Sequence, residues 1–101
     1  MIQINVSAQK HAPQINIQTV KGIYPESSTR ILKYSDNEGL TSWDFKIMRN
    51  EIYARKGYIF KTNDMNIYFR RTTWYNPRYT NIDKLLTKIE KINIDYIKSF
   101  E

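Results

Sequence analysis

The amino-acid sequence predicts a mainly α-helical fold, a small bundle of about three short helices with irregular, aromatic-rich connections. Three observations lead to this fold class. A chain of 101 residues is near the size at which one hydrophobic core is stable and two are not. A Leu-Thr-x-x-acid pattern, typical of a helix start, occurs at residues 40–44 and again at 86–90. Aromatic residues make up 14% of the chain and can fill one small core.

Residues 1–20 are predicted to form an N-terminal β-hairpin or an extended arm, because apolar and polar residues alternate over 2–6 and 14–18. The single domain is expected to occupy residues 21–101. His11 stands without a second histidine or a cysteine nearby, so neither a metal site nor a cofactor is predicted.

Turn residues dominate residues 21–39, with one helical turn expected near residues 31–34. The strongest helix signal follows. Thr41 and Asp44 can form a capping box at its start, and Gly57 can adopt the left-handed conformation that ends it.

On a helical wheel of this central segment, Glu51 and Arg55 lie four residues apart between two apolar strips. We interpret them as a structural ion pair inside the core, with Gly57 as the helix stop. The opposite arc is predicted to face water, and it holds Lys46, Arg49, Asn50 and Lys56.

A short second helix is expected from the polar run at residues 62–64 to about Arg71, and Asn76-Pro77 turns the chain afterwards. The last helix is predicted to start at Thr87, after a possible helical turn over 81–85. Its predicted core face holds Ile89, Ile92, Tyr96 and Phe100, widened by Ile94 and Ile97. For the whole domain the predicted packing residues are Trp43, Met48, Ile52, Phe60, Phe69, Trp74 and Ile92.

The chain has a net charge of +6, most of it between residues 44 and 79, and can therefore attract anionic partners. Arginines alternate with aromatic residues in one segment, which is the candidate binding site: Arg70, Arg71, Trp74, Tyr75, Arg78 and Tyr79. In the alternative reading, Trp74 and Tyr75 are buried and the arginines cover their faces as ordinary cation–π contacts.

Catalysis is not predicted. Asp44 and Glu51 share a helix face and could in principle act as an acid–base pair in a small hydrolase. Asp44 is better explained as a capping residue, and Glu51 as the partner of Arg55. The sequence also has no Gly-rich phosphate loop, no Gly-x-Ser-x-Gly elbow and no His-Glu-x-x-His pair.

Residues 49–60, RNEIYARKGYIF, resemble the signature of the YARHG domain, a bacterial family. Further landmarks of that family occur within residues 40–101: Leu40-Thr41 before the signature, and after it Tyr68-Phe69, Trp74-Tyr75 with Pro77, and Glu90 with Asn93-Ile94, Ile97 and Glu101. Lys56 stands where the family name has histidine, so a histidine-dependent role is not expected. The resemblance implies an extracytoplasmic module, in the periplasm or at the cell surface, without a catalytic activity of its own.

Together these observations predict a non-enzymatic binding module of the bacterial cell envelope, with an envelope protein or an anionic wall component as partner. The alternative is a nucleic-acid-binding module that uses the same Arg70–Tyr79 segment. The sequence contains neither an apolar run long enough to span a membrane nor a signal-peptide core at its start.

Overall fold

The computed structural model describes residues 20–101, and the predicted arm or hairpin at residues 1–20 lies almost wholly outside them. The α-helices are α1 (Ser42–Arg55), α2 (Asn63–Arg70) and α3 (Lys88–Lys98). Single turns of 3-10 helix are η2 (Pro25–Ser28), η3 (Tyr34–Asn37) and η4 (Asp83–Leu85). The mainly helical prediction is confirmed. The turn expected near 31–34 lies later in the chain, since residues 31–33 are not helical and η3 begins at Tyr34.

Helix α1 begins and ends where the sequence predicts. The Thr41 hydroxyl accepts a hydrogen bond from the Asp44 N–H at 3.2 Å, and the Asp44 carboxylate accepts one from the Thr41 N–H at 2.8 Å. At the other end Gly57 has a φ of +87°, and the Tyr58 N–H donates to the Tyr53 carbonyl. This pattern satisfies the last carbonyls of the helix and turns the chain away.

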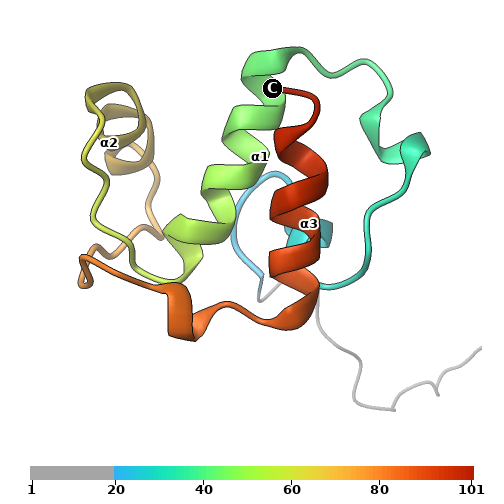
Figure 1. Ribbon diagram of the computed structural model, residues 1–101. Coiled ribbons are helices and arrows are strands. Elements are labelled where there is room, and N and C mark those ends of the chain that lie inside the picture. The colour runs from blue at the N-terminus through green and yellow to red at the C-terminus, as the bar shows by residue number, and fades with distance from the viewer. Residues whose placement is uncertain (1–19) are drawn as a thin grey trace, which may run out of the picture.

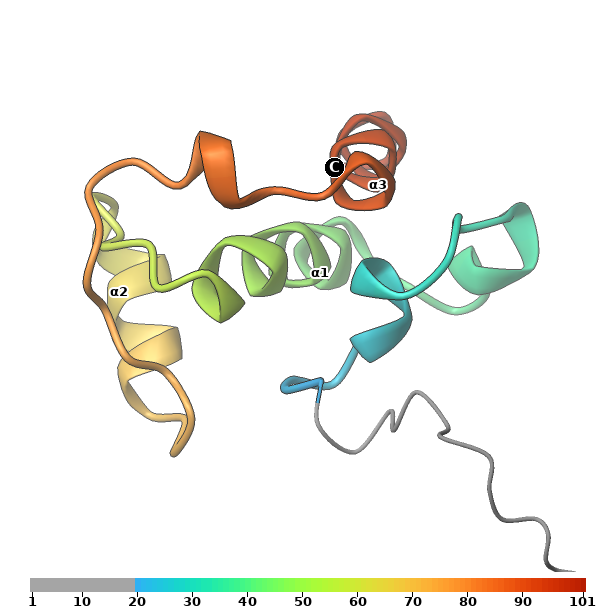
Figure 2. The same cartoon turned by 90° about the horizontal axis from the view of Figure 1, so that it is seen from below.

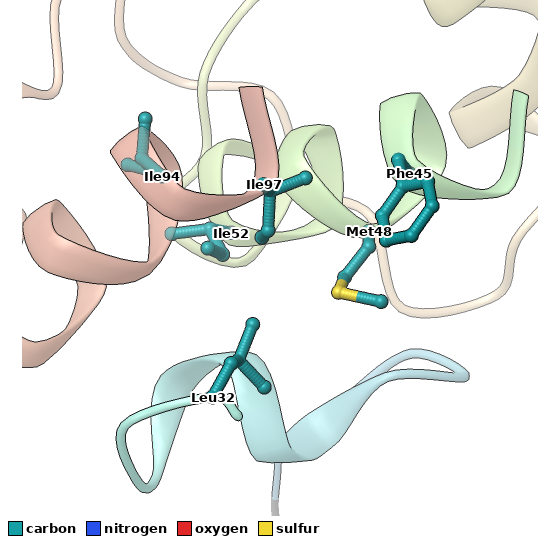
Figure 3. Packing of buried hydrophobic residues seen from close by; sticks show 6 residues of the cluster. All are labelled: Leu32, Phe45, Met48, Ile52, Ile94 and Ile97. Atoms are coloured by element: carbon teal, nitrogen blue, oxygen red, sulfur yellow. The ribbon is translucent and has the colours of Figure 1, made fainter. Parts of the chain in front are cut away.

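Helices α1 and α3 pack side by side, and the chain around η2 packs against both of them (Figures 1 and 2). The first core cluster fills the space between these three elements. Figure 3 shows Leu32 of the N-terminal segment pointing towards the two helices. The cluster consists of Leu32, Phe45, Met48, Ile52, Ile94 and Ile97.

The predicted core face of α3 was wrong at Ile92, which is 43% exposed. Asn93 is fully buried instead, and Glu90 is nearly so. Both polar side chains have partners inside the fold. The rest of the prediction largely holds, since Ile94 and Ile97 belong to the first core cluster and Tyr96 and Phe100 pack against it. The buried face is therefore shifted from Ile92 towards Asn93 and Glu90.

A second core cluster lies on the other side of α1, against α2 and the chain that follows it; its buried members are Ile47, Ala54, Phe60, Met65 and Phe69. The Phe60 and Phe69 rings stack with centroids 5.0 Å apart. Trp43, predicted to be buried, is 46% exposed and belongs to neither cluster. Lys46 lies 5.7 Å above its ring.

Candidate functional site

The acid–base pair of α1 is an ion pair inside the fold. Arg55 Nη2 lies 3.0 Å from Glu51 Oε1, and the two side chains are 8% and 2% exposed. The same carboxylate accepts hydrogen bonds from the backbone N–H groups of Ile23 at 2.8 Å and Tyr24 at 2.9 Å. Residues 20–24 are thereby attached to a helix almost thirty positions later in the sequence.

All five N–H groups of the Arg55 guanidinium have acceptors. One binds Glu51, and the other four bind the Lys21 and Tyr24 carbonyls and the hydroxyls of Ser27 and Ser28. A fully bonded guanidinium has no donor left for a substrate. The pair therefore holds the N-terminal segment in place.

Burial acts against the charges of this pair. It raises the pKa of Glu51, and the Ile23 and Tyr24 N–H groups and the Arg55 charge oppose that rise. Burial also lowers the pKa of Arg55, and the charge of Glu51 opposes that fall. Five donated hydrogen bonds require a protonated guanidinium, so the geometry is that of a charged pair.

A second buried carboxylate joins α1 to α3. Lys56 Nζ lies 2.9 Å from Glu90 Oε1, although the sequence placed Lys56 towards solvent. That prediction was wrong because a helical wheel of α1 alone cannot show that the start of α3 lies beside Lys56. Burial raises the pKa of Glu90, but the Thr87 N–H and Lys56 outweigh burial and keep the pKa below its ordinary value.

The aromatic half of the predicted binding segment is largely part of the second core cluster. Trp74 and Tyr75 are half-buried against that cluster. The Trp74 ring packs edge-on against Phe69 with centroids 6.0 Å apart, and the Tyr75 hydroxyl donates to the Tyr58 carbonyl. Their ring faces are thus committed mainly to packing.

The basic half of the segment is exposed but lies at two places. Arg70 ends α2 and Arg71 follows it directly, and Arg70 Nε donates to Asn66 Oδ1 at 2.6 Å. Arg78 and Tyr79 lie at the end of α1, where their N–H groups donate to the Gly57 carbonyl at 2.8 and 2.9 Å. The Arg78 guanidinium stands 5.5 Å from the centre of the Tyr79 ring.

The structure also contains a cleft that sequence reasoning missed. It has a volume of about 430 Å³ and lies between the middle of α1, the start of α2 and residues 80–83. Apolar and aromatic side chains are joined there by three basic residues and one acid: Lys46, Arg49, Lys61 and Asp83. No local motif could reveal this cleft, because its walls come from three separate parts of the chain.

Asn50 contributes to the cleft and was predicted to face water. It is 6% exposed, and its Nδ2 donates to the Lys46 carbonyl at 2.9 Å. Residues 58–65 and 80–83 cover this side of α1, which is why the expected polar arc is not a free surface.

Within residues 20–101 no three histidine, cysteine or carboxylate side chains gather as they would around a metal ion. None of the helices described is long and apolar enough to cross a membrane.

Comparison with known proteins gives one match. The family model described as the YARHG domain matches residues 20–101, which confirms the resemblance found in the sequence. The match also covers residues 20–39, part of which bonds to Glu51 and Arg55. No curated protein and no solved structure matches the chain.

Proposed function

The chain belongs to the YARHG domain family, and we propose that it is a non-enzymatic binding module of the bacterial cell envelope. Its partner is an envelope protein or an anionic wall component. The family is generally extracytoplasmic, which supports this location.

The distribution of ion pairs is the observation that carries the proposal. Among the arginines of residues 20–101, Arg30, Arg49 and Arg55 each form an ion pair with a carboxylate. Arg70, Arg71 and Arg78 form none, and all three are exposed. Exposed cations without a partner on the same molecule attract anionic groups on another one. We therefore retain these arginines, with Tyr79, as the proposed contact residues, at the end of α2 and at the end of α1.

The carboxylates considered for catalysis support a non-enzymatic role. Asp44 caps α1 through Thr41, while Glu51 is buried and already bonded to Arg55. A general acid or base must reach a substrate. These two carboxylates are occupied in holding the fold.

A nucleic-acid-binding module remains the alternative, but the geometry favours it less. Binding of single strands relies on aromatic faces on which bases can stack. Trp74 and Tyr75 use their rings in the second core cluster, which leaves Tyr79 as the exposed ring of the segment.

Cosedimentation with an insoluble bacterial cell-wall preparation tests the proposal. The full chain should sediment with the wall material, and the double variant Arg70→Glu/Arg71→Glu should remain largely in solution. A matched double variant on α3, Lys88→Glu/Lys91→Glu, changes the net charge equally at two exposed positions and should behave like the wild type.

Equal loss of binding in both double variants would show a general charge effect and would count against the proposed surface. Single-stranded DNA retained at about 50 mM salt and released at about 200 mM salt, without wall binding, would favour the alternative.

A further inference from the structure

We propose that the cleft between α1, the start of α2 and residues 80–83 binds a short zwitterionic peptide with an apolar or aromatic side chain. The cleft is a different site from the exposed arginines discussed above, and the peptide is a different ligand from the partner proposed for them. The inference goes beyond the proposed function and does not depend on it.

The interior of the cleft suits an apolar side chain. Phe60, Met65 and Ile82 contribute to it and are each at most 6% exposed, and the half-buried rings of Tyr53 and Tyr58 stand beside them. Its volume of about 430 Å³ falls in the range of about 300–1,000 Å³ that is common for small-molecule sites. Filling it with a ring would remove apolar surface from water.

Asn50 supplies a hydrogen-bond acceptor at the cleft. Its Nδ2 is bonded to a backbone carbonyl, but its Oδ1 accepts no hydrogen bond from the residues described. Among those residues the one fully buried side-chain atom without a partner is Asn37 Nδ2. Asn50 Oδ1 is therefore not fully buried, and because Asn50 lines the cleft, we assign this oxygen as an acceptor for a peptide N–H.

The charges around the cleft indicate a ligand with both signs. Lys46 is paired with Asp64 at 2.8 Å, and Arg49 is paired with the carboxylate of Glu101. Lys61 and Asp83 form no ion pair with another residue in the 20–101 segment, and both are exposed.

One free cation and one free acid thus line the same cleft. A zwitterionic peptide can place its carboxylate near Lys61 and its ammonium group near Asp83. A phosphate or a polyanion would satisfy Lys61 but meet repulsion from Asp83, so charge complementarity favours the peptide.

NMR titration of the ¹⁵N-labelled full chain tests the inference. The probe is the dipeptide alanyl-phenylalanine, raised to about 10 mM, which would nearly saturate a site with a millimolar Kd. Amide signals of Asn50, Tyr53 and Tyr58 should shift together. Alanyl-alanine, which lacks the ring, should bind more weakly.

Two variants then test which charged end of the dipeptide each of the two cleft residues binds. Lys61→Ala should weaken binding of the free dipeptide by about tenfold and leave binding of its C-terminal amide unchanged. Asp83→Asn should weaken binding of the free dipeptide to a similar degree and leave binding of its N-acetyl form unchanged. Lys91→Ala and Asp95→Asn, at exposed positions on α3, are the matched controls.

The inference is overturned if no dipeptide shifts the cleft signals at about 10 mM. It is also overturned if the α3 controls weaken binding as much as the cleft variants do, or if inorganic phosphate shifts the same signals more strongly than the dipeptide. None of these results depends on wall binding, so this inference and the proposed function can fail separately.

Discussion

Gly22 and Glu51 are in such close contact that no side chain fits between them. A Cβ atom built on Gly22 would lie 2.4 Å from Oε1 of Glu51, and the residue has a φ of +107°. The backbone crosses directly over the carboxylate, and the next two N–H groups bind it. The buried acid and the loop above it therefore require each other.

Substitution of Gly22 by alanine should destabilise the domain strongly. The left-handed backbone costs about 1–2 kcal/mol for a residue with a Cβ, and displacement of the carboxylate should add about 1–3 kcal/mol. Gly39→Ala is the control, since Gly39 has a φ of +76° but open space around it. Urea unfolding should show a clearly larger loss for Gly22→Ala. Equal losses would mean that the contact with Glu51 contributes nothing.

Removal of the Arg55 side chain should be far more harmful than removal of Arg49. Arg55→Ala leaves the buried carboxylate of Glu51 without its cation, which costs on the order of 3–5 kcal/mol. Arg49 pairs with Glu101 nearer the surface, so Arg49→Ala should cost about 1 kcal/mol or less. Thermal melting of the two variants side by side measures the difference. Similar melting temperatures would contradict the structural role given to the buried pair.

Asn93 should be the most sensitive polar residue of α3. Its Oδ1 accepts from the Leu32 N–H at 2.9 Å, and its Nδ2 donates to the carbonyls of Ser27 and Arg30. Asn93→Ala leaves buried backbone groups unsatisfied at about 1–3 kcal/mol each, so a loss of about 3 kcal/mol or more is expected. Asp95→Ala, exposed on the same helix, should change the free energy of unfolding little. An Asn93→Ala variant as stable as this control would refute the assignment.

Stability should depend on pH through Asp36. The hydrogen bond from Arg30 lowers the pKa of Asp36 from 3.8 to about 2. A carboxylate whose pKa is lower in the folded protein stabilises the fold at pH values above its pKa in the unfolded chain. This contribution disappears as the pH falls from about 4 to about 2. The stability difference between wild type and Asp36→Asn should therefore be largest near neutral pH and shrink through that window. Urea midpoints at several pH values test this, and a constant difference would contradict it.

The local parts of the fold could be predicted because their causes are local. Capping boxes at Thr41 and Thr87 and the left-handed Gly57 lie within a few residues of the helix ends they determine. The placement of Glu51 beside Arg55 between two apolar strips likewise follows from helix geometry alone.

Other features could not be predicted because their partners are distant in sequence. Asn93 and Glu90 look like surface residues until Leu32 and Lys56 are known to lie beside them. An apolar wheel consequently preferred Ile92 for the core. The cleft has the same cause, since Asn50 is covered by residues far along the chain.

The hydrogen bonds of Asn93 have a consequence for how the domain folds. They join residues 61 to 66 positions apart, so these bonds to Ser27, Arg30 and Leu32 form only when α3 has formed and docked. Contacts of such long range close large loops before they return any stabilisation, which slows folding. A chain still missing its last helix would leave in water both Leu32 and the face of α1 that α3 covers. We expect refolding to occur in a single cooperative step, with no stable intermediate built from α1 and α2 alone.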